Sequence, residues 1–345
     1  MRKRSFIPKS SALATGLAMA ATTMLLVPLA SATPKVPTFK DFGPWATTGS
    51  NVVFAATIGK RAGLWIEKFG SNTPRRIAPA YCGPGLEEVD QLAVGPKGSV
   101  ACLEATQGNT EVNFNLAFIS SSGAFKHVAS AGGPSVEGVP PVDYIPVVFG
   151  DSSFLGYLHV TADGLVQLMR ISSTGHPQHV ADLADVSKPG AVAIDSGHIA
   201  ITQSGGTVSV YTVAGRHVSS FAAGAASGPS VGIRKDRVVV RTTAHRFGVY
   251  TLQGQLVHSY PVRAAGGVTM GLATYAGYVV YIGAGKAVHA LKLTTGRDRI
   301  IARAGKGSFW SGLSLQAPGA VVPFGTTGGM TLDFIPISKI RAKVG

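Results

Sequence analysis

The chain is poor in cysteine and in acidic residues, and it lacks the short motifs that hold metals and nucleotides. Of its 345 residues two are cysteines, and 17 are acidic against 31 basic. No phosphate-binding glycine loop, paired C-x-x-C, H-E-x-x-H or calcium-loop pattern occurs, and these absences argue against the commonest metal- and nucleotide-dependent enzymes. The sequence therefore implies no cofactor, no metal ligand and no assigned catalytic residue.

Long apolar runs are also missing, apart from one at the start. Arg2, Lys3 and Arg4 form a basic segment, residues 12–29 are apolar, and Ala30-Ser31-Ala32 matches a small-x-small cleavage site. This order predicts a secretory signal peptide over residues 1–32, and hence a secreted protein, extracellular or periplasmic. An uncleaved anchor is the alternative, because the run is nearly long enough to span a membrane. Neither cysteine lies in this region, which excludes a lipoprotein anchor.

Residues 33–345 are predicted to form one domain. They carry 27 basic and 17 acidic residues, a net charge of +10. The basic residues are scattered, so nucleic acid is not the expected partner. A basic exported protein instead meets anionic polymers and acidic polysaccharides, with weak non-specific attraction. We expect a monomer with no membrane-embedded segment once the signal is removed.

The two cysteines are predicted to pair. Cys82 lies in a connecting segment and Cys102 in the next predicted strand. In an oxidising compartment a disulfide is the default. It would contribute about 3 kcal/mol by the loop-entropy estimate.

What the chain does contain is a repeat of turn, apolar strand, loop, second strand and glycine-marked hairpin. The turn-and-strand half occurs seven times: GSNVVFAAT (49–57), KGSVACLEAT (97–106), DSSFLGYLHVT (151–161), SGHIAITQ (196–203), KDRVVVRTT (235–243), AGYVVYIG (276–283) and PGAVVPFG (318–325). A period of about 40 to 54 residues built from short strands is typical of a β-propeller. The prediction is an all-β, seven-bladed β-propeller with four-stranded antiparallel blades.

Glycines mark the hairpin between the third and fourth strands of six blades. They are Gly70, Gly123, Gly175, Gly215, Gly254 and Gly296, where a positive φ is expected. The seventh blade lacks this glycine and has no clear fourth strand. We expect residues 36–42 to supply its outer strand, closing the ring from the N-terminal side and protecting the edge. The alternative is closure by residues 340–344. No helical period stands out in residues 33–345.

Unusual polar and aromatic residues gather in the long connections between blades. The candidate binding residues are Tyr81, Glu87, Glu88, Asp90, Asp143, Tyr144, Arg263, Lys306 and Trp310. Because loops on rigid scaffolds commonly carry function, we expect them to frame one mouth of the central channel as a carbohydrate- or peptide-binding face. The alternative is a solvated rim, with Trp310 packed between blades.

Two other patterns resemble catalytic signatures. His127, His179 and His217 share one repeat position at the start of the outer strand, which favours a surface strand preference over a site. The segment 228–232 matches G-x-S-x-G around Ser230, but a strand follows where the nucleophile elbow needs a helix. An interblade turn is the expected structure there.

Three units carry a resemblance to known repeats: VHALKLTTGRDRIIA (288–302), VSVYTVAGRHVSS (208–220) and FGVYTLQGQLVHS (247–259). They are similar to the strand–turn–strand element of bacterial secreted propellers with TolB-like, YVTN-type or quinoprotein-like repeats. Ile300 or Ile301 stands near the place of the quinoprotein tryptophan, and the Trp-Asp ending of WD repeats and the Asp-box are absent. The resemblance thus implies the fold and transfers no catalytic residue.

The leading hypothesis is an exported, non-enzymatic propeller that binds a protein, peptide or glycan of the cell envelope or outside the cell. A purely structural envelope component is a second hypothesis. The alternative from another class is a hydrolase or lyase acting on a glycan or small metabolite. It would use acidic residues of the connecting loops together with a histidine near a central hairpin, namely Glu87, Glu88, Asp90 or Asp143 with His245 or His289.

Overall fold

The computed structural model describes residues 38–79, 90–108, 111–134, 143–226, 230–262, 272–283, 287–305, 309–310, 312–326 and 328–345. They belong to one compact unit that spans residues 36–345. The predicted signal peptide therefore lies outside the described residues. No helix in the described part is both long and apolar enough to cross a membrane.

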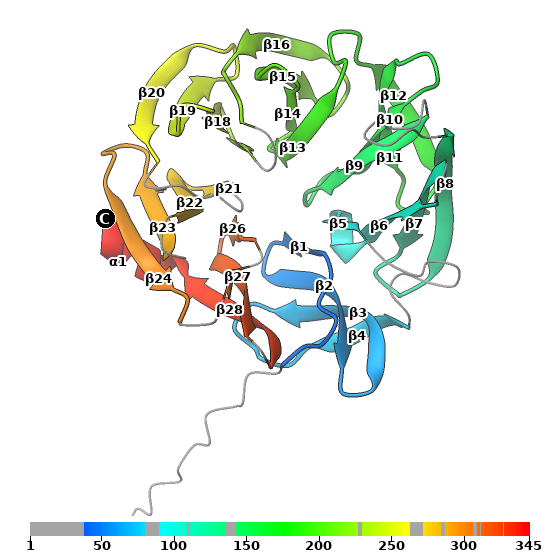
Figure 1. Ribbon diagram of the computed structural model, residues 1–345, viewed down its shortest axis with the longest axis horizontal. Coiled ribbons are helices and arrows are strands. Elements are labelled where there is room, and N and C mark those ends of the chain that lie inside the picture. The colour runs from blue at the N-terminus through cyan, green and yellow to red at the C-terminus, as the bar shows by residue number, and fades with distance from the viewer. Residues whose placement is uncertain are drawn as a thin grey trace, which may run out of the picture. The chain divides into compact units, whose positions relative to one another are not determined.

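Seven antiparallel four-stranded sheets make up this unit, and they are arranged as the blades of a β-propeller (Figure 1). Blade one comprises β1 (Trp45–Thr48), β2 (Asn51–Ile58), β3 (Arg61–Lys68) and β4 (Arg75–Pro79), and blade two comprises β5 (Gln91–Val94), β6 (Val100–Gln107), β7 (Glu111–Ile119) and β8 (Phe125–Pro134). Blade three comprises β9 (Tyr144–Gly150), β10 (Leu155–Val160), β11 (Val166–Ile171) and β12 (Pro177–Asp182). Blade four comprises β13 (Pro189–Asp195), β14 (His198–Gln203), β15 (Thr207–Thr212) and β16 (His217–Ala222).

The remaining strands make up blades five to seven. They comprise β17 (Val231–Arg234), β18 (Arg237–Arg241), β19 (Arg246–Thr251), β20 (Leu256–Pro261); β21 (Leu272–Tyr275), β22 (Tyr278–Gly283), β23 (Ala287–Lys292), β24 (Asp298–Arg303); β25 (Phe309–Trp310), β26 (Ser314–Gln316), β27 (Gly319–Thr326) and β28 (Gly329–Pro336). The innermost strands contact one another in a closed ring, β1–β5–β9–β13–β17–β21–β26 and back to β1. The predicted fold class is confirmed.

Burial of apolar side chains between blades holds the ring together. Seven hydrophobic clusters are found among the described residues, one at each interface between neighbouring blades. They form because alternate residues of each strand point to opposite faces of the sheet, and both faces of every blade are covered by a neighbour. The predicted turn glycines are confirmed too, with φ from 66° at Gly296 to 87° at Gly123.

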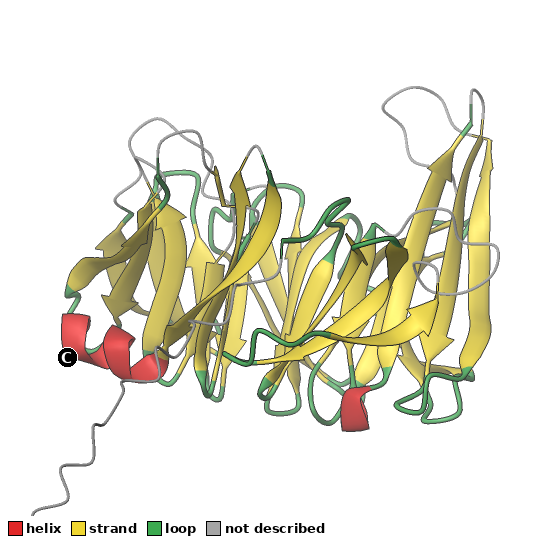
Figure 2. Cartoon of the chain, turned by 90° about the horizontal axis from the view of Figure 1, so that it is seen from below, coloured by secondary structure: helices red, strands yellow, loops and turns green. Residues whose placement is uncertain are grey.

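The meander gives the propeller two faces that are formed by different connections. Turns between the first and second strands, and between the third and fourth, lie on one face, here called the hairpin face. The remaining turns and the connections between blades lie on the opposite face, here called the loop face. Figure 2 shows both short helical segments, the turn Pro96–Gly98 and the C-terminal helix α1 (Ile337–Val344), along its lower side, which is the hairpin face.

The last blade is built differently from the other six. Its inner strand is split into β25 and β26, which both pair with β27, and β28 is the outermost strand of the sheet. The N-terminal segment reaches β28 through one bridge, where Phe39 N donates to Met330 O (2.7 Å) and Met330 N donates to Phe39 O (2.9 Å). Lys40 then bridges to Thr57 of β2. The N-terminal segment thus joins blade seven to blade one as expected, and its described residues 38–42 do so by isolated bridges instead of a full strand.

The alternative closure by residues 340–344 is wrong, because these residues belong to α1. Ile340 and Val344 are both buried and lie four residues apart on one side of the helix. They join the apolar cluster between blades six and seven. Two buried positions in an eight-residue helix give too short a period to detect in the sequence.

Candidate functional site

Few of the predicted binding residues fall within the described chain. Tyr81, Glu87, Glu88, Arg263 and Lys306 lie outside it, as does Cys82, and of Trp310 only the backbone in β25 is described. Cys102 is buried in β6. The binding face built on these loop residues and the Cys82–Cys102 disulfide both stay predictions.

Asp90, Asp143 and Tyr144 are described, and each is engaged within or beside its own blade. Asp90 accepts a hydrogen bond from the backbone N–H of Ala105. Asp143 Oδ1 lies 2.6 Å from His159 Nε2. The Tyr144 ring lies 6.1 Å from that of Phe114, and burial raises the pKa of the Tyr144 hydroxyl.

Asp90 also lines a hollow of about 460 Å³ with Phe42 and Trp45, between blades one and two. Asp143 does not line this hollow. The described residues therefore show no convergence of these two carboxylates on one substrate position, as glycosidase chemistry would require.

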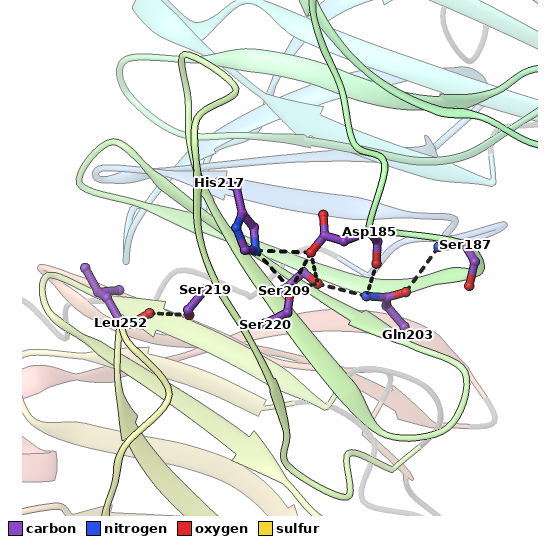
Figure 3. Close-up of polar contacts among 8 residues, drawn as sticks. All are labelled: Asp185, Ser187, Gln203, Ser209, His217, Ser219, Ser220 and Leu252. Atoms are coloured by element: carbon purple, nitrogen blue, oxygen red, sulfur yellow. Dashed lines mark hydrogen bonds and ion pairs between the residues drawn. The ribbon is translucent and has the colours of Figure 1, made fainter.

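A polar cluster that the sequence did not reveal lies in blade four (Figure 3). Asp185, in the connection from β12 to β13, places Oδ2 3.1 Å from His217 Nε2 and 3.2 Å from Ser209 Oγ. Ser220 Oγ lies 3.0 Å from the same His217 nitrogen and 2.7 Å from Ser209 Oγ. Gln203 Nε2 donates to the backbone oxygen of Asp185 at 3.0 Å. The cluster thus links the connection between blades three and four to strands β14, β15 and β16.

This Asp–His–Ser combination does not have the geometry of a catalytic relay. In a serine nucleophile system the carboxylate orients one imidazole nitrogen and the hydroxyl bonds to the other. Here Asp185 and Ser220 both lie on Nε2 of His217, so the histidine cannot pass a proton between them. The cluster is a hydrogen-bond network in which Asp185, His217 and Ser220 are exposed and Ser209 is buried, and it is not a nucleophilic site.

The recurring histidine position has a structural cause. Six outer strands carry a β-bulge that leaves one β-branched residue out of the pairing: Ile77, Val128, Val180, Val218, Val257 and Ile301. An extra residue in a strand brings positions i and i+3 to the same side. Three histidines bond the side chain at i+3 in this way, namely His127 to Ser130 (2.9 Å), His179 to Asp182 (2.8 Å) and His217 to Ser220 (3.0 Å).

His289, considered above as a possible catalytic partner, is buried. Its Nδ1 lies 3.0 Å from Asp298 Oδ1, and the Tyr281 hydroxyl donates to Asp298 Oδ2. The Tyr281 ring stacks on the imidazole at 5.0 Å and meets Phe247 of blade five edge-on at 4.9 Å. Only 5% of His289 is exposed, so this cluster stabilises the interface between blades five and six. His245 is an exposed turn residue on the loop face.

Ser230 is not accessible as a nucleophile. It is fully buried, and its Oγ has no hydrogen-bond partner in the described chain. Its backbone oxygen accepts a hydrogen bond from Arg241 N, which starts the pairing of β17 with β18. Ser230 directly precedes β17, at the end of the connection from blade four, where the sequence predicts an interblade turn.

The central channel offers little chemistry. A hollow of about 290 Å³ is lined by the inner strands of all seven blades, and none of its described lining residues is charged. Thr47, Ser314 and Gln316 supply polar side chains there and bond to one another across blades one and seven.

The hairpin face carries two adjoining hollows across blades one to three. One, of about 480 Å³, lies between blades two and three, and the other, of about 400 Å³, between blades one and two. They share Lys97, Ser120, Ser121 and Ser152. We call this pair of hollows the hairpin groove. Sequence reasoning missed it because its residues lie in separate short turns.

Comparison with known proteins supports the fold alone. No protein-family model matches the chain, and no curated protein matches its sequence. Among solved structures it is similar to a chain of the mitotic checkpoint complex, with 14% identity, 72% of this chain and 81% of that chain covered, and a TM-score of 0.50. It is also similar to Sqt1 of Saccharomyces cerevisiae, with 12% identity, 87% and 86% covered, and a TM-score of 0.51. These are WD40-like neighbours, and they show a seven-bladed β-propeller.

Proposed function

We propose that this protein is an exported, non-enzymatic β-propeller that binds a protein, peptide or glycan partner of the cell envelope. The observation that carries the proposal is the hairpin groove. Its two hollows are each within the size range of ligand sites and lie on a rigid scaffold of paired strands. By contrast, the described Asp–His–Ser cluster lacks relay geometry and the His289 cluster is buried.

Export is supported by the basic start, the apolar run and the small-x-small site of residues 1–32. The repeat's resemblance to bacterial secreted propellers supports the same location. The mitotic checkpoint complex is by its name an assembly, which is in line with a propeller used for binding.

A fractionation and capture experiment tests this proposal. The protein should be recovered from the envelope or medium of its host with Thr33 as its first residue, measured by mass spectrometry. Immobilised wild-type protein should retain a specific partner from envelope extract at moderate salt. Retention unchanged by substitutions on either face, or a purely cytoplasmic protein, would contradict the proposal.

The two faces are compared with two baits. One carries Arg75→Gln, Lys97→Gly and Arg170→Gln in the hairpin groove, and the other carries Asp143→Asn and Tyr144→Ala on the loop face. Loss of the partner with the first bait places binding on the hairpin face. Loss of the partner with the second bait would support the loop-face site predicted from the sequence.

A further inference from the structure

The hairpin groove carries positive charge that the described protein does not neutralise. Arg75 lines one hollow, Arg170 the other, and Lys97 lines both. All three are exposed, and none forms an ion pair with a carboxylate of the described chain. Among the described residues, no aspartate or glutamate lines either hollow. The groove therefore favours an anionic ligand.

Asp151, next in sequence to the lining residue Ser152, turns its carboxylate into its own loop. Asp151 Oδ1 accepts hydrogen bonds from Ser153 N (2.7 Å), Ser153 Oγ (2.8 Å) and Phe154 N (2.9 Å). These three donors partly offset its charge. Repulsion of an anion in the groove is correspondingly weak.

Several serines also line the groove. Ser121, Ser152 and Ser173 line it, are exposed, and make no hydrogen bond within the described chain. A hydroxyl both donates and accepts, so it suits the hydroxyl groups of a sugar ring as well as an anionic oxygen. The groove thus combines cations for charged groups with hydroxyls for neutral ones.

The groove lacks the features that two other anionic partners, nucleic acids and membranes, require. Phe118 is the one aromatic residue among the described lining, and only 3% of it is exposed, so it offers no stacking platform for nucleic-acid bases. The large apolar side chains exposed in the described chain, Phe125, Leu256 and Val257, do not line it. The groove therefore presents none of these side chains for insertion into a membrane.

We propose that the hairpin groove binds an acidic polysaccharide, with Arg75, Lys97 and Arg170 pairing with its anionic groups and the serines bonding to its hydroxyls. The inference rests on the proposed binding function and names its partner class. Two adjoining hollows that share Lys97 fit successive sugar units of one chain, with Lys97 between them.

Titration of the full chain with polygalacturonate, followed by calorimetry, tests the assignment. The groove variant Arg75→Gln, Lys97→Gly, Arg170→Gln should bind at least about tenfold more weakly than wild type. Glycine suits position 97 because Lys97 has φ 58°, so its charge is removed without straining the turn. The matched control is Arg216→Gln, Lys235→Gly, Arg341→Gln, which removes the same charge from exposed positions outside the groove. Lys235 has φ 51° in the equivalent turn of blade five, and the control should stay within about threefold of wild type.

Equal weakening of both variants would overturn the site, because net charge alone would then explain binding. Polyphosphate, duplex DNA or anionic phosphatidylglycerol vesicles that bind as tightly as polygalacturonate would overturn the glycan assignment, with neutral dextran as the uncharged sugar control. If the triple variant does not fold by circular dichroism, Lys97→Gly against Lys235→Gly gives the same comparison. Specific capture of an envelope partner without polygalacturonate binding would refute this inference and leave the proposed function standing.

Discussion

Blades four and six each contain an aspartate–histidine pair with hydroxyl partners, and the two differ in burial. Side-chain exposure is 48% for His217 and 37% for Asp185, but 7% for His289 and 6% for Asp298. In blade four the pair joins a surface connection to two strands, whereas in blade six it lies between two blades. In blade four, water competes for the hydrogen bonds of the exposed pair, so the pair stabilises the fold only weakly. In blade six, water does not reach the buried pair, so the same residue types stabilise the interface between blades.

The largest effect is expected from Asp298→Ala. It leaves the Tyr281 hydroxyl and His289 Nδ1 without their shared acceptor in a buried site. We expect a loss of about 4 kcal/mol in the free energy of unfolding, measured by urea denaturation. Asp185→Ala is the matched control. Equal losses in the two variants would remove the distinction drawn from burial.

A third carboxyl sharpens the comparison, because it is buried without full pairing. Glu67 of β3 is 1% exposed, and its Oε2 has no hydrogen-bond partner in the described chain. Burial raises the pKa of Glu67 from its ordinary 4.5 to about 7, against a smaller lowering by the backbone N–H of Asn72. Between these values the unfolded chain has released the proton and the folded chain still holds it, so stability falls as pH rises through this window.

Glu67→Gln removes this pH dependence. Relative to wild type the variant should be more stable by about 3 kcal/mol above pH 8 and similar near pH 4.5. Thermal unfolding at a series of pH values measures the difference. A constant difference across the series would mean that Glu67 is not protonated in the folded protein at neutral pH.

The smallest effect is expected from His217→Ala in the exposed pair. Its bonds to Asp185 and Ser220 lie at the surface, so we expect a loss of no more than about 1 kcal/mol. A double-mutant cycle with Asp185→Ala isolates the pairwise energy. A coupling above 2 kcal/mol would place this pair with the buried cluster and break the comparison.

The candidate site was harder to predict than the scaffold. Asp143 and Tyr144 stand out in the sequence because acidic and aromatic residues are rare and gather in loops, yet Asp143 contacts His159 of its own blade. The groove residues Arg75, Lys97 and Arg170 are ordinary in sequence, and they meet only because blades one to three stand side by side. The i+3 partners of the histidines were visible in the sequence, but their meaning depends on a bulge that no local pattern announces.

The sequence by itself determined the number of blades, the antiparallel meander and the turn glycines. These follow from local alternation, from a repeat period and from the positive φ that a tight turn needs. The tertiary structure decided which side chains share a hollow, which histidine is buried, and that the last residues form helix α1 against blades six and seven. Those outcomes depend on contacts between residues far apart in the chain, which burial and the closure of the ring create together.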